Sequence, residues 1–301
     1  MTTISLSQKL LLKFKRRLLY YLNLAIKKPD YIVMFCFSRI HLIRYLVKLI
    51  FKEKTNLKYE GNSVFADIEV NHIVDTLKKE GIYLGLNLPE YVLQEIIDCS
   101  KHITYFGNAN LQFSFHLAEK QKEEQKHGKD FITGYNFDIS SICPAIKKLE
   151  NDPKLWSIAT KYFEKKPANV ISKIWWTFPQ KKEVEERAKG FFCFHYDLED
   201  YWCLKFMFYL TNVDVDSGPH VCVKSSHKRK KLSHQFSLLR ETDDNDIISY
   251  YGSENILTIC ERAGVGFVED PFCFHKGTIP IQRERLILEV KFTLHNYETI
   301  P

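Results

Sequence analysis

The stretch from Phe191 to Asp197, FFCFHYD, places two side chains with metal-binding chemistry two residues apart. In an extended strand alternate residues share a face, so the imidazole of His195 and the carboxylate of Asp197 would point the same way. Such an H-x-D pair predicts half of a metal site. Because the pair alone arises by chance in many chains, a third ligand must come from elsewhere in the fold.

A third ligand has several candidates among the later histidines, namely His220, His227, His234, His275 and His295. His275 is the best placed, because it ends the mainly apolar run that starts at Gly266 and is followed by a turn-like Lys-Gly-Thr sequence. Two histidines and one carboxylate on one face of a metal leave three positions open, which is typical of non-haem Fe(II) oxygenases. The open positions would bind O₂ and a chelating co-substrate.

An arginine near such a site offers a planar fork for a carboxylate, here the distal carboxylate of a 2-oxo acid. Arg285 lies ten residues after His275 and begins the apolar strand Leu286 to Val290. Arg283 lies two residues earlier and is the alternative.

With these pieces together, residues 170–295 resemble the phytanoyl-CoA dioxygenase family of Fe(II)/2-oxoglutarate oxygenases. The resemblance rests on His195-Tyr196-Asp197, on the later His275 and on Arg285 before a last apolar strand. It is extended by the turn from Leu210 to Pro219 and by the element from Lys224 to Lys228. Ser225, where the family usually has Gly, and His220, where an apolar residue is common, depart from the pattern.

The resemblance implies a double-stranded β-helix, a cupin-like jelly roll, with His195, Asp197 and His275 as metal ligands. It also implies that Arg285 holds 2-oxoglutarate, with Thr278 assisting. The implied reaction consumes O₂ and 2-oxoglutarate, releases succinate and CO₂, and hydroxylates an unactivated C–H bond. Ascorbate would serve as the reductant. The substrate would be a small molecule, a lipid or a sugar-containing compound.

The elements that must position these residues change in character along the chain. Residues 74–80 predict a helix that ends at Gly81, and further helices are expected over 89–97 and, as a pair broken at Pro153, over 144–166. From residue 170 the sequence is rich in β-branched and aromatic residues, and strands are expected over 170–178, 191–197, 202–211, 219–223, 256–260, 265–269 and 284–294. Short strands after clustered helices predict an α+β protein with a jelly-roll core over 170–295 and a helical buttress over 59–169.

Charge divides the chain into two parts. Residues 1–58 carry 13 basic side chains against two acidic ones, a net charge of +11, whereas the rest of the chain carries 30 basic and 35 acidic residues and is mildly acidic. The basic pI therefore reflects this segment and gives no reason to expect a nucleic-acid groove in the dioxygenase domain, residues 59–301. The composition leaves the oligomeric state open.

The basic N-terminal segment predicts two amphipathic helices over 8–27 and 31–51. They would pack on the body or a partner, or lie on an anionic membrane surface. Eight cysteines without a C-x-x-C pair favour reduced thiols and a cytoplasmic protein, with peripheral membrane association as an added possibility. Two other interpretations of function stay open: a catalytically inactive jelly-roll binding protein, and a membrane-surface adaptor acting through residues 1–58.

Overall fold

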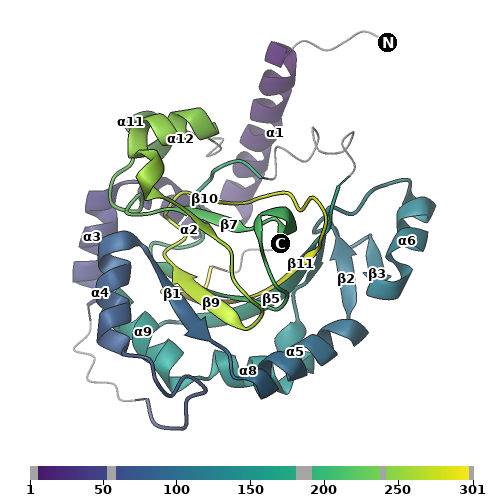
Figure 1. The fold of residues 1–301 in the computed structure, drawn as a ribbon. Helices are drawn as coiled ribbons and strands as arrows, with labels where there is room; N and C mark the ends of the chain where they lie inside the picture. Colours follow the sequence, from purple (N-terminus) through teal and green to yellow (C-terminus); the bar gives the residue numbers. More distant parts are fainter. Residues whose placement is uncertain (1–5, 53–58, 181–191, 238–241, 298–301) are drawn as a thin grey trace.

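A computed structural model describes residues 6–52, 59–180, 192–237 and 242–297 (Figure 1). Two antiparallel sheets lie at its centre, and helices from the first half of the chain surround them. This arrangement confirms the expected α+β architecture. In the described part of the chain, no helix is both long and apolar enough to cross a membrane.

Most of the helices lie before residue 164. Those of the described residues are α1 Leu6–Lys27, α2 Pro29–Phe37, α3 His41–Ile50, α4 Val70–Glu80, α5 Glu90–His102, α6 Lys120–His127, α7 Ile139–Ile142, α8 Pro144–Glu150, α9 Pro153–Phe163, α11 Leu232–Gln235 and α12 Asp244–Tyr251. Short 3₁₀ turns follow at η1 Leu117–Glu119, η3 Val215–Ser217 and η4 Ser253–Asn255.

The strands are β1 Ile82–Asn87, β2 Thr104–Gly107, β3 Ser114–His116, β4 Thr133–Asn136, β5 Asn169–Thr177, β6 Cys203–Tyr209, β7 His220–Val223, β8 Ile256–Ile259, β9 Val265–Glu269, β10 His275–Gly277 and β11 Arg285–Thr293. The larger sheet has the order β1-β9-β6-β11-β5-β4-β2-β3, and the smaller one the order β10-β7-β8. Strand β11 lies at the centre of the larger sheet, paired with β5 on one side and β6 on the other.

Local sequence signals explain where two of the helices begin or end. Helix α9 starts at Pro153, and the carboxylate of Asp152 accepts hydrogen bonds from the backbone N–H groups of Lys154 and Leu155. Helix α4 ends at Gly81, which adopts the left-handed conformation with φ of 79°. Both boundaries confirm the sequence-based expectation.

The larger sheet has two unlike faces because side chains alternate along each strand. Even-numbered residues such as Leu288 on β11, Phe206 on β6 and Ile174 on β5 are fully buried against the helices. Figure 1 places α5 and α8 along the lower side of this sheet. The odd-numbered residues of the same strands point to the other side, toward the smaller sheet, and build the candidate site.

Three expectations need correction. Residues 192–197 do not form a strand: Phe194 and His195 make isolated bridges to Thr242 and His275, and residue 191 lies outside the described residues. The segment 59–169 is not purely helical, since β1 to β4 extend the larger sheet at both ends. Residues 6–52, the described part of the N-terminal segment, form three helices, because the second predicted helix is interrupted between Phe37 and His41. The predicted charged loop after Gln180 lies outside the described residues from 181 to 191.

Candidate metal centre

Three side chains converge at one end of the smaller sheet. One ligand atom each from His195, Asp197 and His275 lies within 4.8 Å of the others. The Nε2 atom of His275 is 3.5 Å from Oδ2 of Asp197, and Nε2 of His195 is 4.0 Å from Oδ1. The backbones of the two histidines pair directly, with each N–H donating to the other's carbonyl. The fold brings these three residues together although 78 positions separate Asp197 from His275.

The two imidazoles are oriented by their own chain. Nδ1 of His195 lies 2.9 Å from the carbonyl oxygen of Cys193, and Nδ1 of His275 lies 3.0 Å from that of Cys273. With Nδ1 donating to this carbonyl, Nε2 of each ring is directed toward Asp197 and can bind a metal once it carries no proton. The donor set of two imidazoles and one carboxylate therefore fits a divalent metal ion such as Fe(II).

A cavity of about 270 Å³ opens from this cluster between the two sheets. Its walls come mainly from odd-numbered residues of the larger sheet, so the strand alternation that buries one face exposes the other to the cavity. The lining residues include Thr133, Tyr135, Lys173, Trp175, Thr177, Lys205, Met207, Arg285, Ile287 and Glu289.

Arg285 is buried in this wall and directs its guanidinium into the cavity region. It donates to the carbonyl of Gly218 through Nη1 and to Oγ1 of Thr177 at 3.2 Å through Nη2. Its Nε is buried without a hydrogen-bond partner, and each Nη has a second N–H, so the guanidinium keeps donors for another acceptor. Arg283 instead lies outside, 60% exposed, and pairs with Asp214. Thr278 donates to the carbonyl of Pro219 and is not among the residues that line the cavity.

Lys205 carries a buried charge beside Asp197. Its Nζ lies 2.6 Å from Asp197, 2.9 Å from Glu199 and 3.7 Å from Glu289. Burial favours the neutral lysine, but these three carboxylates outweigh it and hold the pKa of Lys205 well above its usual value. In return, Lys205 and His275 outweigh burial and keep the pKa of Asp197 well below its usual value.

A second buried pair, His220 and Glu269, closes the far wall, with 3.0 Å between Nε2 and Oε2. Burial lowers the pKa of His220, and Glu269 only partly opposes it. The pKa of Glu269 falls to about 2, because the charges of His220 and His275 outweigh its burial. The same carboxylate and Asp197 outweigh burial at His275 and raise its pKa to about 9. A metal ion at Nε2 of His275 would therefore displace a proton.

The remaining candidate histidines have other partners. His295 pairs with Asp200 at 2.9 Å, His234 contacts Asp246, and Nδ1 of His227 lies 3.4 Å from Sγ of Cys273. Glu199, Glu289 and the pairing of His220 with Glu269 were not predicted from the sequence. A signal for Glu289 was available, because a charged residue inside the apolar run Leu286 to Val290 is costly unless it is paired.

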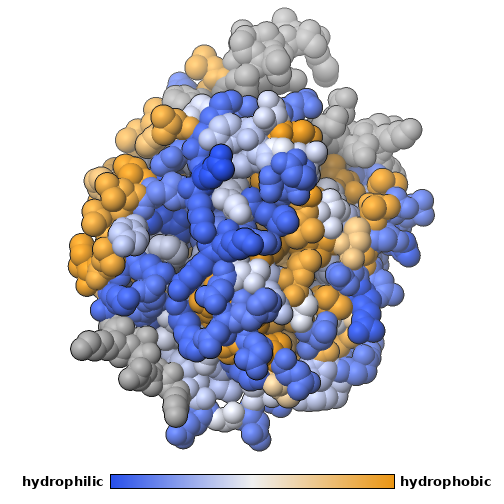
Figure 2. Space-filling view, turned by 60° about the vertical axis from the view of Figure 1, so that its left-hand side comes forward, coloured by the Kyte–Doolittle hydropathy of each residue, from blue (hydrophilic) through white to orange (hydrophobic). Residues whose placement is uncertain are grey.

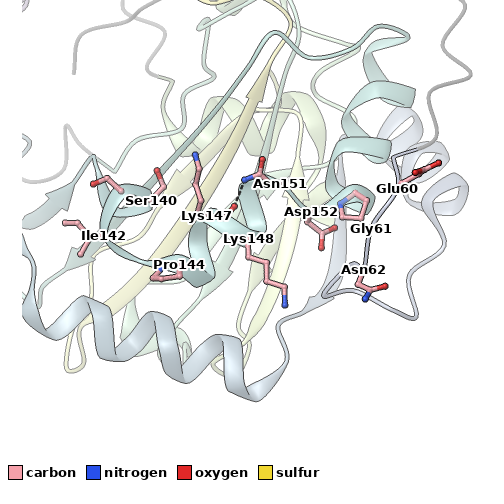
Figure 3. A pocket seen from close by; sticks show the side chains of 12 residues that line it. Glu60, Gly61, Asn62, Ser140, Ile142, Pro144, Lys147, Lys148, Asn151 and Asp152 are labelled. Carbon is pink, nitrogen blue, oxygen red and sulfur yellow. Dashed lines mark hydrogen bonds between the residues drawn. The ribbon is translucent and has the colours of Figure 1, made fainter.

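A wider hollow of about 560 Å³ lies elsewhere, between the segment 60–62 and helices α7 and α8 (Figure 3). Asp152 at its edge already accepts from Ser63 and from the backbone of Val64 in addition to capping α9. This carboxylate therefore serves the framework, and we place the chemistry in the cavity beside His195, Asp197 and His275.

Comparison with known proteins adds support for the fold. No protein-family model matches the sequence, and no curated protein sequence matches it significantly. Among solved structures, HygX from Streptomyces hygroscopicus with nickel and 2-oxoglutarate bound is similar with a TM-score of 0.51 and 10% identity, over 75% of this chain and 87% of that one. EvdO2 from Micromonospora carbonacea var. aurantiaca is similar with a TM-score of 0.50 and 11% identity, over 77% and 93%. The predicted cupin-like jelly-roll fold is thereby confirmed.

Proposed function

We propose that this protein is an Fe(II)- and 2-oxoglutarate-dependent oxygenase of the phytanoyl-CoA dioxygenase type. The observation that carries the proposal is the convergence of His195, Asp197 and His275, with ligand atoms within 4.8 Å, on a cavity that also holds Arg285. The fold shared with HygX, whose structure contains nickel and 2-oxoglutarate, supports it.

In this proposal each residue of the cavity has a separate task. His195, Asp197 and His275 hold the metal through two nitrogen atoms and one oxygen atom. Arg285 receives the distal carboxylate of 2-oxoglutarate, and Arg283, which faces solvent, has no such task. When bound, the metal and 2-oxoglutarate supply an oxidant for an unactivated C–H bond, with O₂ consumed and succinate and CO₂ released.

The cavity wall protects that chemistry from water. Trp175 stacks on Tyr135 with 5.6 Å between ring centroids, and both rings line the cavity together with Phe192. A volume of about 270 Å³ beside the metal is small, so we propose that only the reacting end of a small-molecule, lipid or sugar-containing substrate enters it. Hydroxylation is the proposed outcome.

All eight cysteines are free thiols, which favours a reducing compartment. We therefore propose a cytoplasmic location, with peripheral membrane contact through residues 1–58.

The test is succinate release by the purified chain supplied with Fe(II), 2-oxoglutarate and ascorbate. We expect activity in the natural chain and in the matched surface variant His116→Ala, and a loss of at least about 100-fold in Asp197→Ala. Binding of Ni(II) and 2-oxoglutarate by calorimetry separates a missing substrate from a missing site. Failure to bind either one would favour the catalytically inactive jelly-roll protein.

A further inference from the structure

Helix α3 turns its charged side chains toward the interior of the molecule. Arg44 is 5% exposed, donates through Nε to the carbonyl of Tyr201 at 2.9 Å and pairs with Asp270 at 3.4 Å. Its guanidinium also lies 3.9 Å from the ring centroid of Phe272. One turn later, Lys48 donates to the carbonyl of Tyr162 at 2.8 Å. These contacts fix the rotation of α3 about its own axis.

The opposite face of the same helix is apolar and faces outward. The exposed residues are Leu42 (64%), Tyr45 (56%), Leu46 (44%), Leu49 (47%) and Ile50 (73%). Their spacing of 0, 3, 4, 7 and 8 positions is that of the stripe by which an amphipathic helix usually packs on a core. Here the stripe points away from the core, and we call these five residues the outer apolar face.

This face is continued by neighbouring elements. Val33 and Phe37 on α2 are 52% and 46% exposed, and Phe51 after α3 is 44% exposed. In Figure 2 hydrophobic side chains gather along the left-hand edge of the molecule, on the side where Figure 1 places α3. A contiguous exposed apolar surface of this kind marks an interaction site.

Helix α1 adds exposed apolar and basic side chains. It projects from the body (Figure 1), and Leu22 and Ile26 are 55% and 84% exposed. Lys15 and Lys27 are exposed on the same helix. Since residues 1–58 contain only Asp30 and Glu53 as acidic residues, the charge that accompanies the outer apolar face is almost entirely positive.

We propose that the outer apolar face, together with α1, docks on an anionic phospholipid surface. Apolar side chains among positive charges match the acyl boundary and the headgroups of such a surface. A second copy of this chain fits less well, because two positively charged segments would face each other. Because the contacts of Arg44 and Lys48 tie α3 to the body, the docked face holds the jelly roll in one orientation. This inference does not depend on the proposed oxygenase activity.

Sedimentation of the purified full chain with phosphatidylcholine vesicles, with and without about 30% phosphatidylserine, tests the proposal. We expect binding to the anionic vesicles that weakens as the salt concentration rises. The triple variant Leu42→Glu, Leu46→Glu and Leu49→Glu should lose at least about tenfold in vesicle partitioning. The control Tyr91→Glu, Ile142→Glu and Ile248→Glu makes the same change in charge at residues that are 60%, 54% and 44% exposed, and should retain most of the binding.

Since the altered leucines are exposed, the triple variant should keep the natural chain's circular dichroism spectrum. A second variant, Lys15→Glu with Lys27→Glu, leaves the outer apolar face intact and should weaken binding most at low salt. The proposal is overturned if the natural chain ignores anionic vesicles at low salt, or if both triple variants lose binding equally. It is also overturned if the chain ignores the vesicles but forms a dimer that only the α3 variant abolishes, because a second copy would then be the occupant.

Discussion

The ammonium group of Lys205 lies 2.6 Å from Oδ2 of Asp197, so the carboxylate of the candidate metal centre forms an ion pair with a buried lysine. Lys205 is 5% exposed and also contacts Glu199 and Glu289. Each of those carboxylates has another cation, since Lys291 contacts Glu199 and Lys173 lies 3.0 Å from Glu289. Lys205 is therefore, with His275, a main counter-charge of Asp197 when no metal is bound.

Replacing Lys205 with Met should destabilise the metal-free protein strongly. The change leaves the partly buried carboxylate of Asp197 without its lysine partner, and breaking a buried pair from one side costs up to about 3–5 kcal/mol. Urea denaturation after treatment with EDTA measures the free energy of unfolding. Lys161→Met, which removes an exposed lysine, is the matched control and should change this free energy by less than about 0.5 kcal/mol. A loss below about 1 kcal/mol at position 205 would show that the charges are not coupled as described.

Replacing Arg285 with Lys should weaken the binding of 2-oxoglutarate while leaving metal binding intact. A lysine keeps the positive charge but loses the planar fork that pairs with a carboxylate, and we expect roughly 30- to 100-fold weaker binding. Calorimetry with Ni(II)-loaded protein measures the dissociation constant without turnover. Arg283→Lys is the matched control, because Arg283 is exposed and pairs with Asp214. If both changes altered the dissociation constant of 2-oxoglutarate equally, Arg285 would not have its proposed role.

The Glu269–His220 pair predicts how stability depends on pH. The pKa of Glu269 is about 2 in the folded protein against an ordinary value of 4.5, so the folded state holds its carboxylate charged. A lowered carboxyl pKa gives stability that is present above pH 4.5 and is lost as the pH falls toward 2. The shift corresponds to roughly 3 kcal/mol.

Glu269→Gln should therefore lower the free energy of unfolding at pH 7. It should also reduce the loss of this free energy as the pH falls from 4.5 to 3. Urea denaturation of the metal-free protein at several pH values measures both effects. Glu254→Gln alters an exposed carboxylate and should leave a pH profile parallel to that of the natural chain. Parallel profiles for the Glu269 variant as well would contradict the assignment of this charge.

Local sequence signals were enough to locate most strands and the three converging residues. The β-branched and aromatic run at 170–178 became β5, and the run at 284–294 became β11. His195, Asp197 and His275 could be singled out because metal ligands are chemically distinctive. Residues 192–197 were misjudged because two apolar–polar alternations predict a strand, whereas only Phe194 and His195 of this segment form β-bridges.

The buried charges could not be located from the sequence, because they depend on strand register. Lys205 faces Glu269 and Lys291 in the ladders of β6 with β9 and β11, and no local pattern fixes those pairings. Helix α3 shows a related limit. Its apolar stripe was expected to face the body, a partner or a membrane surface. The contacts of Arg44 with Tyr201 and of Lys48 with Tyr162, which join residues far apart in sequence, decide that it faces outward.

Gly81→Ala should damage both the fold and the candidate metal centre. Gly81 has φ of 79°, and a Cβ there would lie 2.3 Å from Sγ of Cys273 and 2.5 Å from Nδ1 of His227. Both side chains are buried and have little room to move. The left-handed conformation costs an alanine about 1 kcal/mol, and the overlap adds about 1–3 kcal/mol. Gly128→Ala isolates the first cost, because Gly128 has φ of 60° and a methyl group there would meet nothing within 4 Å.

The overlap with Cys273 should also change the orientation of His275, because the two residues are linked through the backbone. Cys273 supplies the carbonyl that lies 3.0 Å from Nδ1 of His275, and the turn at Gly81 is held by the hydrogen bond from Asp270 N–H to the Gly81 carbonyl. Displacing Cys273 would therefore tilt the imidazole of His275 away from Asp197. We expect Gly81→Ala to weaken Ni(II) binding by about 10- to 100-fold, and Gly128→Ala to leave it unchanged. Unfolding curves and Ni(II) calorimetry on both variants measure the two effects separately. A Gly81 variant that binds Ni(II) normally would show that His275 is oriented independently of this turn.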